Sequence, residues 1–215
     1  MIKCAVFDLD GTLVNTIEDL GLATDFVLKA YGVDIEYTEA DYKKMVGNGA
    51  KKLVERAFDG RLSDDKLQEA YALFKEKYNE IKMDHAKPYP GIKEALDSLK
   101  EKGILLGVVT NKPNEAAQGM VAQFFGEGYF DVVVGATDEL PKKPDPTTLK
   151  MALKKLGCKV TEGIYFGDSN VDMITGRNAG IETVGCSWGF RSFGELFAEN
   201  PSVIIDEPRY ITKLF

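Results

Sequence analysis

Short apolar, β-prone runs alternate with helical patterns, and this alternation limits the possible folds more than any other feature of the sequence. The runs cover residues 3–7, 104–110, 131–135, 163–167 and 182–186. Between two of them, Ile92, Ala95, Leu96 and Leu99 recur at helical spacing, and Gly103 follows as a stop signal. Strands that alternate with helices of this length form βαβ units with right-handed crossovers. The sequence therefore predicts an α/β fold built on a parallel sheet.

Residues 16–85 interrupt the alternation, because they contain helical patterns and no strand signal. Thr16 is predicted to be the N-cap of the first helix, with Asp19 at its third position. Thr38 is predicted to open a second short helix, a third is predicted over residues 50–58, and Ser63 is predicted to open a fourth. We therefore expect an all-helical domain inserted into the α/β domain, with these boundaries: α/β domain, residues 1–15 and 86–215; helical domain, residues 16–85.

Composition and charge exclude several classes of protein. The formal net charge of -7 argues against sequence-independent binding to nucleic acid. No apolar run approaches the roughly 20 residues of a membrane span, and the N-terminus lacks a signal-peptide pattern. The 3 cysteines are far apart, which favours a reducing compartment. We expect a cytoplasmic monomer or homodimer that binds neither nucleic acid nor membranes.

Two carboxylates follow the first apolar run, in the segment Asp8-Leu9-Asp10-Gly11-Thr12. Successive side chains of a strand point to opposite faces. In a loop beyond the end of the strand, both acids can turn toward one ligand. A carboxylate can attack phosphorus, and a second one can transfer a proton. The structural alternative is an acidic turn.

Polar residues also follow two later strands and precede one predicted helix. Thr110 and Asn111 can donate hydrogen bonds to phosphoryl oxygens, although both are also common N-cap residues. Lys143, flanked by prolines on its C-terminal side, is suited to neutralising a phosphate, and its alternative is a solvated lysine. Asp168 is a candidate Mg²⁺ ligand and Asp172 a support for the metal's waters or for Lys143, while helix capping is the alternative for this segment.

In this order, the four segments resemble the motifs of the haloacid dehalogenase (HAD) superfamily, and the resemblance covers the whole chain. It implies a Rossmann-like parallel sheet with helices on both faces, a helical cap domain, and Mg²⁺-dependent phosphatase chemistry through an aspartyl-phosphate. The implied roles are: Asp8, nucleophile and metal ligand; Asp10, general acid/base and backbone-carbonyl metal ligand; Thr110 and Asn111, phosphate binding; Lys143, catalytic cation that neutralises the phosphate; Asp168, metal ligand; Asp172 and Thr12, supporting positions.

The inserted helical domain offers one candidate specificity segment, formed by Gly47, Asn48, Gly49 and Lys51. It looks like the cap loop of phosphoglycolate phosphatases, and its backbone amides and Asn48 could meet an anionic substrate tail. The alternative is a solvated helix face. The expected substrate is a small phosphorylated metabolite, with phosphoglycolate as the leading candidate.

Two other functions remain open. A phosphosugar mutase of the β-phosphoglucomutase type would depend on a bisphosphate activator and release little phosphate. A non-enzymatic phospho-receiver module would lack the helical insert and would not carry its phosphorylated aspartate after the first strand. The only histidine, His85, is expected to be a solvated loop residue, so chemistry that needs several histidines is excluded.

Overall fold

The computed structural model describes residues 1–215, which form two compact units. The larger unit comprises Met1–Val14 and Pro88–Phe215, and the smaller one comprises Asn15–Lys87. The chain passes between them at β2 (Val14–Asn15) and β3 (Lys87–Pro88), which pair as a two-stranded sheet. None of the helices combines the length and apolarity of a membrane span.

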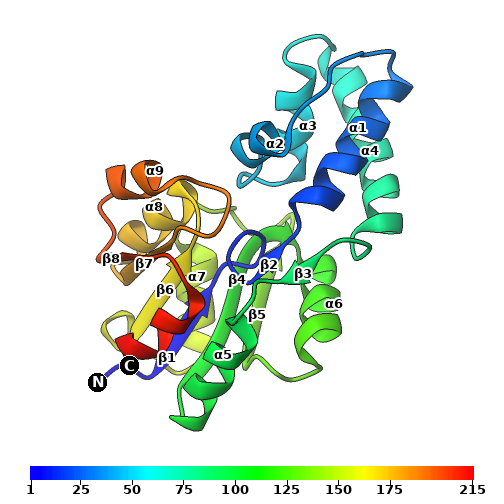
Figure 1. Ribbon diagram of the computed structural model, residues 1–215. Helices are drawn as coiled ribbons and strands as arrows, with labels where there is room; N and C mark the ends of the chain where they lie inside the picture. The colour runs from blue at the N-terminus through cyan, green and yellow to red at the C-terminus, as the bar shows by residue number, and fades with distance from the viewer. The chain divides into compact units, whose positions relative to one another are not determined.

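A six-stranded sheet forms the centre of the larger unit, in the order β5-β4-β1-β6-β7-β8 (Figure 1). Every neighbouring pair is parallel, which confirms the predicted α/β class. The sixth strand, β8, was not predicted, because it has only three residues. The strands are β1 (Cys4–Phe7), β4 (Leu105–Pro113), β5 (Val132–Ala136), β6 (Gly163–Gly167), β7 (Glu182–Cys186) and β8 (Val203–Ile205).

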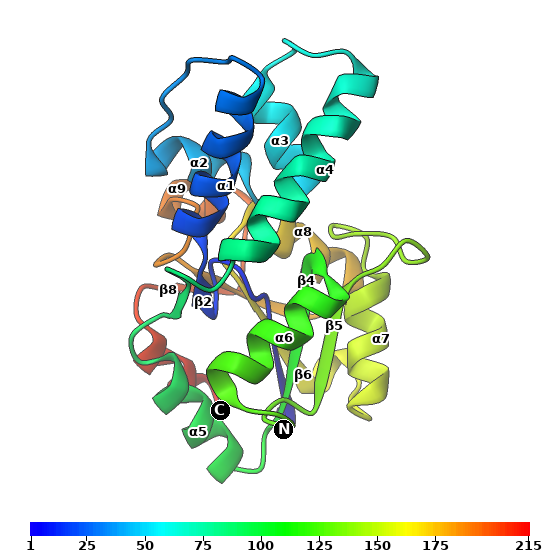
Figure 2. The same cartoon turned by 90° about the vertical axis from the view of Figure 1, so that its right-hand side faces the viewer.

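Helices cover both faces of this sheet (Figure 2). The chain runs outward from β1 to β4 and β5, then returns across the sheet to β6 and β7. Right-handed crossovers therefore place α5 and α6 on one face and α7 and α8 on the other. The helical elements of this unit are α5 (Ile92–Glu101), α6 (Asn114–Phe125), α7 (Thr147–Lys155), η1 (Val160–Glu162), α8 (Asn170–Ala179), α9 (Phe193–Ala198) and η2 (Pro208–Leu214).

The central strand β1 is buried on both sides, which explains its unbroken apolar sequence. Cys4 and Val6 belong to a buried cluster that includes Leu153 of α7. Phe7 points to the opposite face by strand alternation and stacks on Phe166 of β6, with ring centroids 4.7 Å apart. Since β1 lies between β4 and β6, its carboxyl end is where the strand order reverses, the usual position of a ligand site in such sheets.

Strand β4 is longer than predicted. Its pairing with β5 shifts register between Val109 and Pro113, and the backbone stays extended through this irregularity. Thr110, at the predicted end of the run, and Asn111, predicted to follow it, therefore both lie inside β4. The apolar run ends at Val109, but backbone pairing continues beyond it.

The smaller unit contains the four helices predicted for the insert, α1 (Ile17–Ala30), α2 (Glu39–Met45), α3 (Ala50–Phe58) and α4 (Asp64–Ile81). Thr38 forms a complete capping box with Asp41 at the start of α2. Thr16 and Ser63 occupy the predicted N-cap positions, but neither side chain makes a capping hydrogen bond.

Asp19 has partners far away in the sequence instead of a local capping role. Its buried carboxylate accepts hydrogen bonds from the backbone N–H groups of His85 and Ala86. The Nδ1 atom of His85 lies 2.8 Å from Asp19 Oδ1, and its Nε2 atom lies 3.6 Å from Glu18. His85 is exposed in a loop, as predicted, but it is also partnered by Asp19 and Glu18. The hydrogen bond to Asp19 is the main reason that the pKa of His85 lies above its ordinary value.

Candidate active site

Asp8 is the first residue after β1, and it is buried at the carboxyl end of the sheet. Its Oδ1 atom accepts a hydrogen bond from the backbone N–H of Leu9 at 2.7 Å. The same oxygen lies 2.9 Å from the ammonium group of Lys143. The two residues are far apart in the sequence, and the fold brings them together as an ion pair.

Lys143 comes from the segment between β5 and α7, and its side chain is almost fully buried. Besides Asp8, its Nζ atom contacts Asp172 Oδ1 at 2.7 Å, the hydroxyl of Tyr165 at 3.1 Å and the carbonyl of Val109 at 3.2 Å. Burial alone would lower the pKa of Lys143, but the carboxylates of Asp172 and Asp8 outweigh burial. The pKa is therefore raised, and the ammonium keeps its proton.

The side chain of Asn111 holds the backbone of Lys143 on both sides. Its Nδ2 atom donates to the carbonyl of Lys143 at 3.1 Å, and its Oδ1 atom accepts from the N–H of Lys143 at 2.9 Å. The neighbouring hydroxyl of Thr110 accepts a hydrogen bond from the N–H of Lys112 at 3.2 Å. Asn111 is thus a positioning residue for Lys143, a role that the sequence did not indicate.

Asp168 follows β6 by one residue and is held by two donors. The hydroxyl of Thr12 donates to its Oδ1 atom and the N–H of Phe190 to its Oδ2 atom, both at 2.8 Å. The main chain approaches this carboxylate closely, because a Cβ atom on Gly11 would lie 2.3 Å from Asp168 Oδ2. Gly11 also has a φ of 89°, so the turn after Asp10 needs glycine for two reasons.

Asp172 lies in the first turn of α8, where it forms a capping box with Ser169. Its Oδ2 atom accepts from the N–H and the hydroxyl of Ser169, while its Oδ1 atom accepts from Tyr165 at 2.8 Å and pairs with Lys143. Both oxygens are therefore occupied by protein groups. Tyr165 was missed in the sequence, where its position in a buried strand favoured a core role.

Asp8, Asp168 and Asp172 form a compact acidic group, with one oxygen from each lying within 4.8 Å of the others. Burial, and then repulsion by Asp172, raise the pKa of Asp8 well above its ordinary value and that of Asp168 to about 7. A divalent cation would offset this repulsion, and carboxylate oxygens are ligands that Mg²⁺ accepts. The donor set therefore fits a hard metal ion. Asp8 and Asp168 are better placed to bind it than Asp172, because each oxygen of Asp172 already has two protein partners, whereas each oxygen of Asp168 has one.

Asp10 pairs with a lysine that the sequence reading did not single out. The Nζ atom of Lys112 lies 2.9 Å from Asp10 Oδ1, and the lysine side chain is almost completely buried. Its place directly after Thr110 and Asn111 was the available signal. The structure thus brings a second buried cation to the same edge of the sheet.

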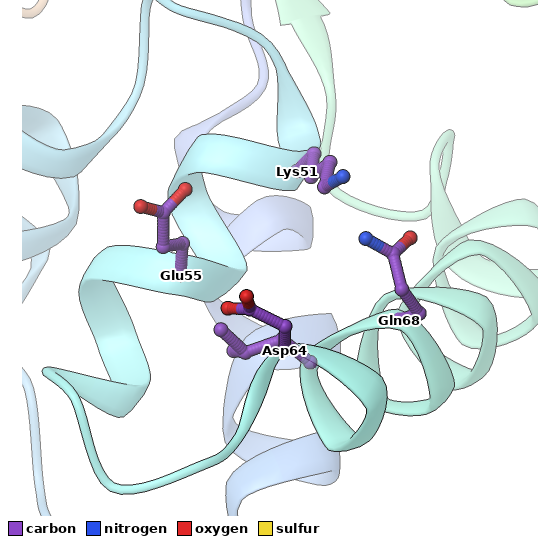
Figure 3. A pocket seen from close by; sticks show the side chains of 5 residues that line it. Lys51, Glu55, Asp64 and Gln68 are labelled. Atoms are coloured by element: carbon purple, nitrogen blue, oxygen red, sulfur yellow. The ribbon is translucent and has the colours of Figure 1, made fainter.

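In the smaller unit, the candidate specificity segment lies at the start of α3, and a side chain of that helix already binds part of it. Arg56 of α3 donates to Asn48 Oδ1 at 2.8 Å, and Lys52 forms an ion pair with Glu55 at 2.7 Å. Lys51 lines a pocket of 310 Å³ between α3 and α4, which it shares with Asp64 and other residues (Figure 3). Gly47 and Gly49 have φ values of 105° and 87°, which explains why glycine stands at both positions.

Comparison with known proteins gives one consistent result. Residues 5–186 match the family model described as haloacid dehalogenase-like hydrolase. The chain is 33% identical to a phosphoglycolate phosphatase of Aquifex aeolicus over 99% of this chain and 96% of that protein. It is 35% identical to a phosphoglycolate phosphatase of Pseudomonas putida, over 96% and 77% of the two chains. A solved structure from Lactobacillus delbrueckii subsp. bulgaricus superposes with a TM-score of 0.93 at 30% identity, covering 99% and 97%.

Proposed function

The chain belongs to the haloacid dehalogenase-like hydrolase family, and we propose that it is a Mg²⁺-dependent phosphatase whose leading substrate is phosphoglycolate. One observation carries the reaction class: the buried Asp8–Lys143 pair lies beside Asp168 in a group of acidic oxygens suited to a divalent cation. The substrate rests on the phosphoglycolate phosphatases that match nearly the whole chain at about one third identity. In this proposal Asn15–Lys87 serves as the cap domain.

The first chemical step transfers the phosphoryl group to Asp8. Its Oδ1 atom is held by Leu9 and Lys143, which leaves Oδ2 to attack phosphorus. The bond between phosphorus and the ester oxygen breaks, and Asp10, which must enter this step protonated on the oxygen that does not face Lys112, gives the ester oxygen that proton. Thr110 and Asn111 bind the phosphoryl oxygens in this proposal; the hydroxyl oxygen of Thr110 accepts from the N–H of Lys112, so its O–H can donate to a phosphoryl oxygen.

The second step releases phosphate from Asp8. Asp10, now ionised, takes a proton from a water molecule that attacks phosphorus, and the bond from phosphorus to Asp8 breaks. Asp8, Asp168 and the carbonyl of Asp10 would hold Mg²⁺, which would neutralise charge on the phosphoryl group. Thr12 and Asp172 support this arrangement, since Thr12 orients Asp168 and Asp172 holds Lys143.

The segment of Gly47, Asn48, Gly49 and Lys51 is part of the proposal as a contact for the anionic end of the substrate. Lys51 is exposed, whereas the neighbouring Lys52 is engaged with Glu55. Lys51→Ala should therefore change the order of preferred substrates, and Lys52→Ala is its matched control. If neither variant changes that order, the segment has no role in specificity.

The deciding experiment measures phosphate release from an aryl phosphate and from a panel of phosphorylated metabolites, with Mg²⁺ and with a chelator. We expect release with Mg²⁺, none with chelator, and none from the Asp8→Asn variant under either condition. Full activity in chelator or in Asp8→Asn would exclude the mechanism. Phosphoglycolate should have the highest kcat/KM of the panel.

A further inference from the structure

Lys112 is a buried ammonium group that the proposed two-step reaction does not use. Its side chain is 3% exposed, and the carboxylate of Asp10, with which it pairs, is 20% exposed. Burying an ammonium is costly even beside a carboxylate, so a lysine here calls for a role beyond packing. The accessible group of the pair is Asp10, which the proposed reaction places in contact with substrate.

The two buried lysines of this site, Lys112 and Lys143, pair with residues that act on opposite sides of the bond between phosphorus and the ester oxygen. Lys143 pairs with Asp8, the residue that attacks phosphorus, and it therefore lies on the phosphoryl side. Lys112 pairs with Asp10, which gives a proton to the ester oxygen and must approach it to about 2.6–3.2 Å. The ammonium of Lys112 is thus one carboxylate group away from the ester oxygen, on the side of the leaving group.

The carboxylates of the site outnumber its ammonium groups, so a cation beside the leaving group affects which substrates can bind. Four carboxylates, those of Asp8, Asp10, Asp168 and Asp172, face only two ammonium groups, those of Lys112 and Lys143. A leaving group with its own negative charge would be repelled unless a cation met it. In the phosphate ester of a 2-hydroxy acid, the carboxylate is attached to the carbon that carries the ester oxygen. Such a carboxylate is close enough to the ester oxygen to reach Lys112, which neighbours Asp10.

We propose that Lys112 binds a carboxylate on the leaving group and makes the enzyme selective for phosphate esters of small 2-hydroxy acids. This inference rests on the proposed function, and it locates a determinant of specificity in the α/β unit rather than in the helical unit. The position is well held, because the backbone N–H of Lys112 bonds to Thr110 at the end of β4. A lysine placed on a strand end is a fixed point charge for an anionic group.

The test compares phosphoglycolate with its primary amide, which has the same shape and a neutral leaving group, and with an aryl phosphate as a generic substrate. Lys112→Met keeps the length of the side chain and removes the charge. Lys142→Met, at an exposed position, is the control. We expect Lys112→Met to lower kcat/KM for phosphoglycolate at least roughly tenfold more than for the amide. Lys142→Met should leave this ratio unchanged.

A binding measurement separates recognition from chemistry. In the inactive Asp8→Asn background, calorimetry should show weaker binding of phosphoglycolate after Lys112→Met and unchanged binding of the amide. Equal losses of binding for phosphoglycolate and its amide would overturn the inference and assign Lys112 a role in keeping Asp10 in place. In that case, activity of the unmodified protein on the aryl phosphate would still support a phosphatase. Absence of hydrolysis of every ester by the unmodified protein would overturn both proposals. If Lys112→Met does not fold, Lys112→Gln replaces it, with the same outcomes.

Discussion

The side-chain amide of Asn111 brackets the backbone of Lys143, accepting from its N–H at 2.9 Å and donating to its carbonyl at 3.1 Å. This pair of bonds connects β4 to the irregular segment that carries the lysine. It explains how a residue outside any helix or strand can present a buried ammonium to Asp8. The position of the Lys143 ammonium thus depends on an amide in a different part of the chain.

Asn111→Ala should lower kcat, because Lys143 would lose its fixed position. It should also destabilise the fold by about 1–3 kcal/mol, since the backbone groups of Lys143 would lose buried partners. The informative measurement is a double-mutant cycle with Lys143→Ala. We expect strong non-additivity in kcat, with Asn111→Ala adding little once the lysine is gone. Additive effects would mean that Asn111 acts on the phosphate alone.

Mg²⁺ should stabilise the folded protein. At a concentration about 100-fold above Kd the gain is about 2.7 kcal/mol, which corresponds to a rise in Tm of roughly 5–11 °C for a chain of this size. Asp168→Asn should abolish most of this rise, whereas Asp10→Asn should retain it, because the expected ligand of Asp10 is its backbone carbonyl. Scanning calorimetry with and without Mg²⁺ tests both variants. Loss of the effect in Asp10→Asn would contradict the assigned ligand.

Without a divalent cation, stability should depend on pH through Asp168. Its pKa is raised by burial and by Asp172 to about 7, so the folded protein holds a proton that the unfolded chain releases near its ordinary value. Stability should therefore fall as the pH rises from about 4 to about 7 and then level off. Urea unfolding in chelator should show a weaker fall for Asp168→Asn. An identical pH profile for the two proteins would contradict the assignment.

Gly11→Ala should disrupt the site more than a positive φ alone explains. The new Cβ would lie 2.3 Å from Asp168 Oδ2. Gly103 has a φ of 75° and open space around it, so Gly103→Ala reports the conformational cost alone, about 1–2 kcal/mol. We expect Gly11→Ala to cost more in urea unfolding and to lose Mg²⁺-induced stabilisation. Equal costs would show that the turn can shift away from Asp168.

His85 is the only histidine, so its ring titration can be followed by NMR without ambiguity. Its pKa should lie above the ordinary value of about 6.5, chiefly because of its hydrogen bond to Asp19. A raised histidine pKa stabilises the folded state fully below the unfolded value, and this stabilisation is lost as the pH rises through the folded value. His85→Gln should remove that pH dependence. A midpoint at or below 6.5 would contradict the Asp19 pairing.

Much of the architecture follows from local patterns in the sequence. Apolar runs predicted five of the six strands of the main sheet, and helical spacing predicted the inserted helices, because burial and backbone periodicity are read over a few residues. The expectation that polar residues at strand ends would meet also needed only the rule that parallel strands end at one edge. Asp8 and Asp168 lie at that edge on these grounds.

Tertiary structure alone decided which groups pair there. The partners of Asp10, Asp19 and Asn111 are separated from them in the sequence by 102, 66 and 32 residues, and no local pattern encodes such a separation. For that reason the partners of Asp19 were not predicted, and Lys112 was missed. The sequence by itself determined which side chains reach the carboxyl edge of the sheet. The three-dimensional packing determined which lysine neutralises which carboxylate, because ion pairing depends on distances that only the folded chain sets.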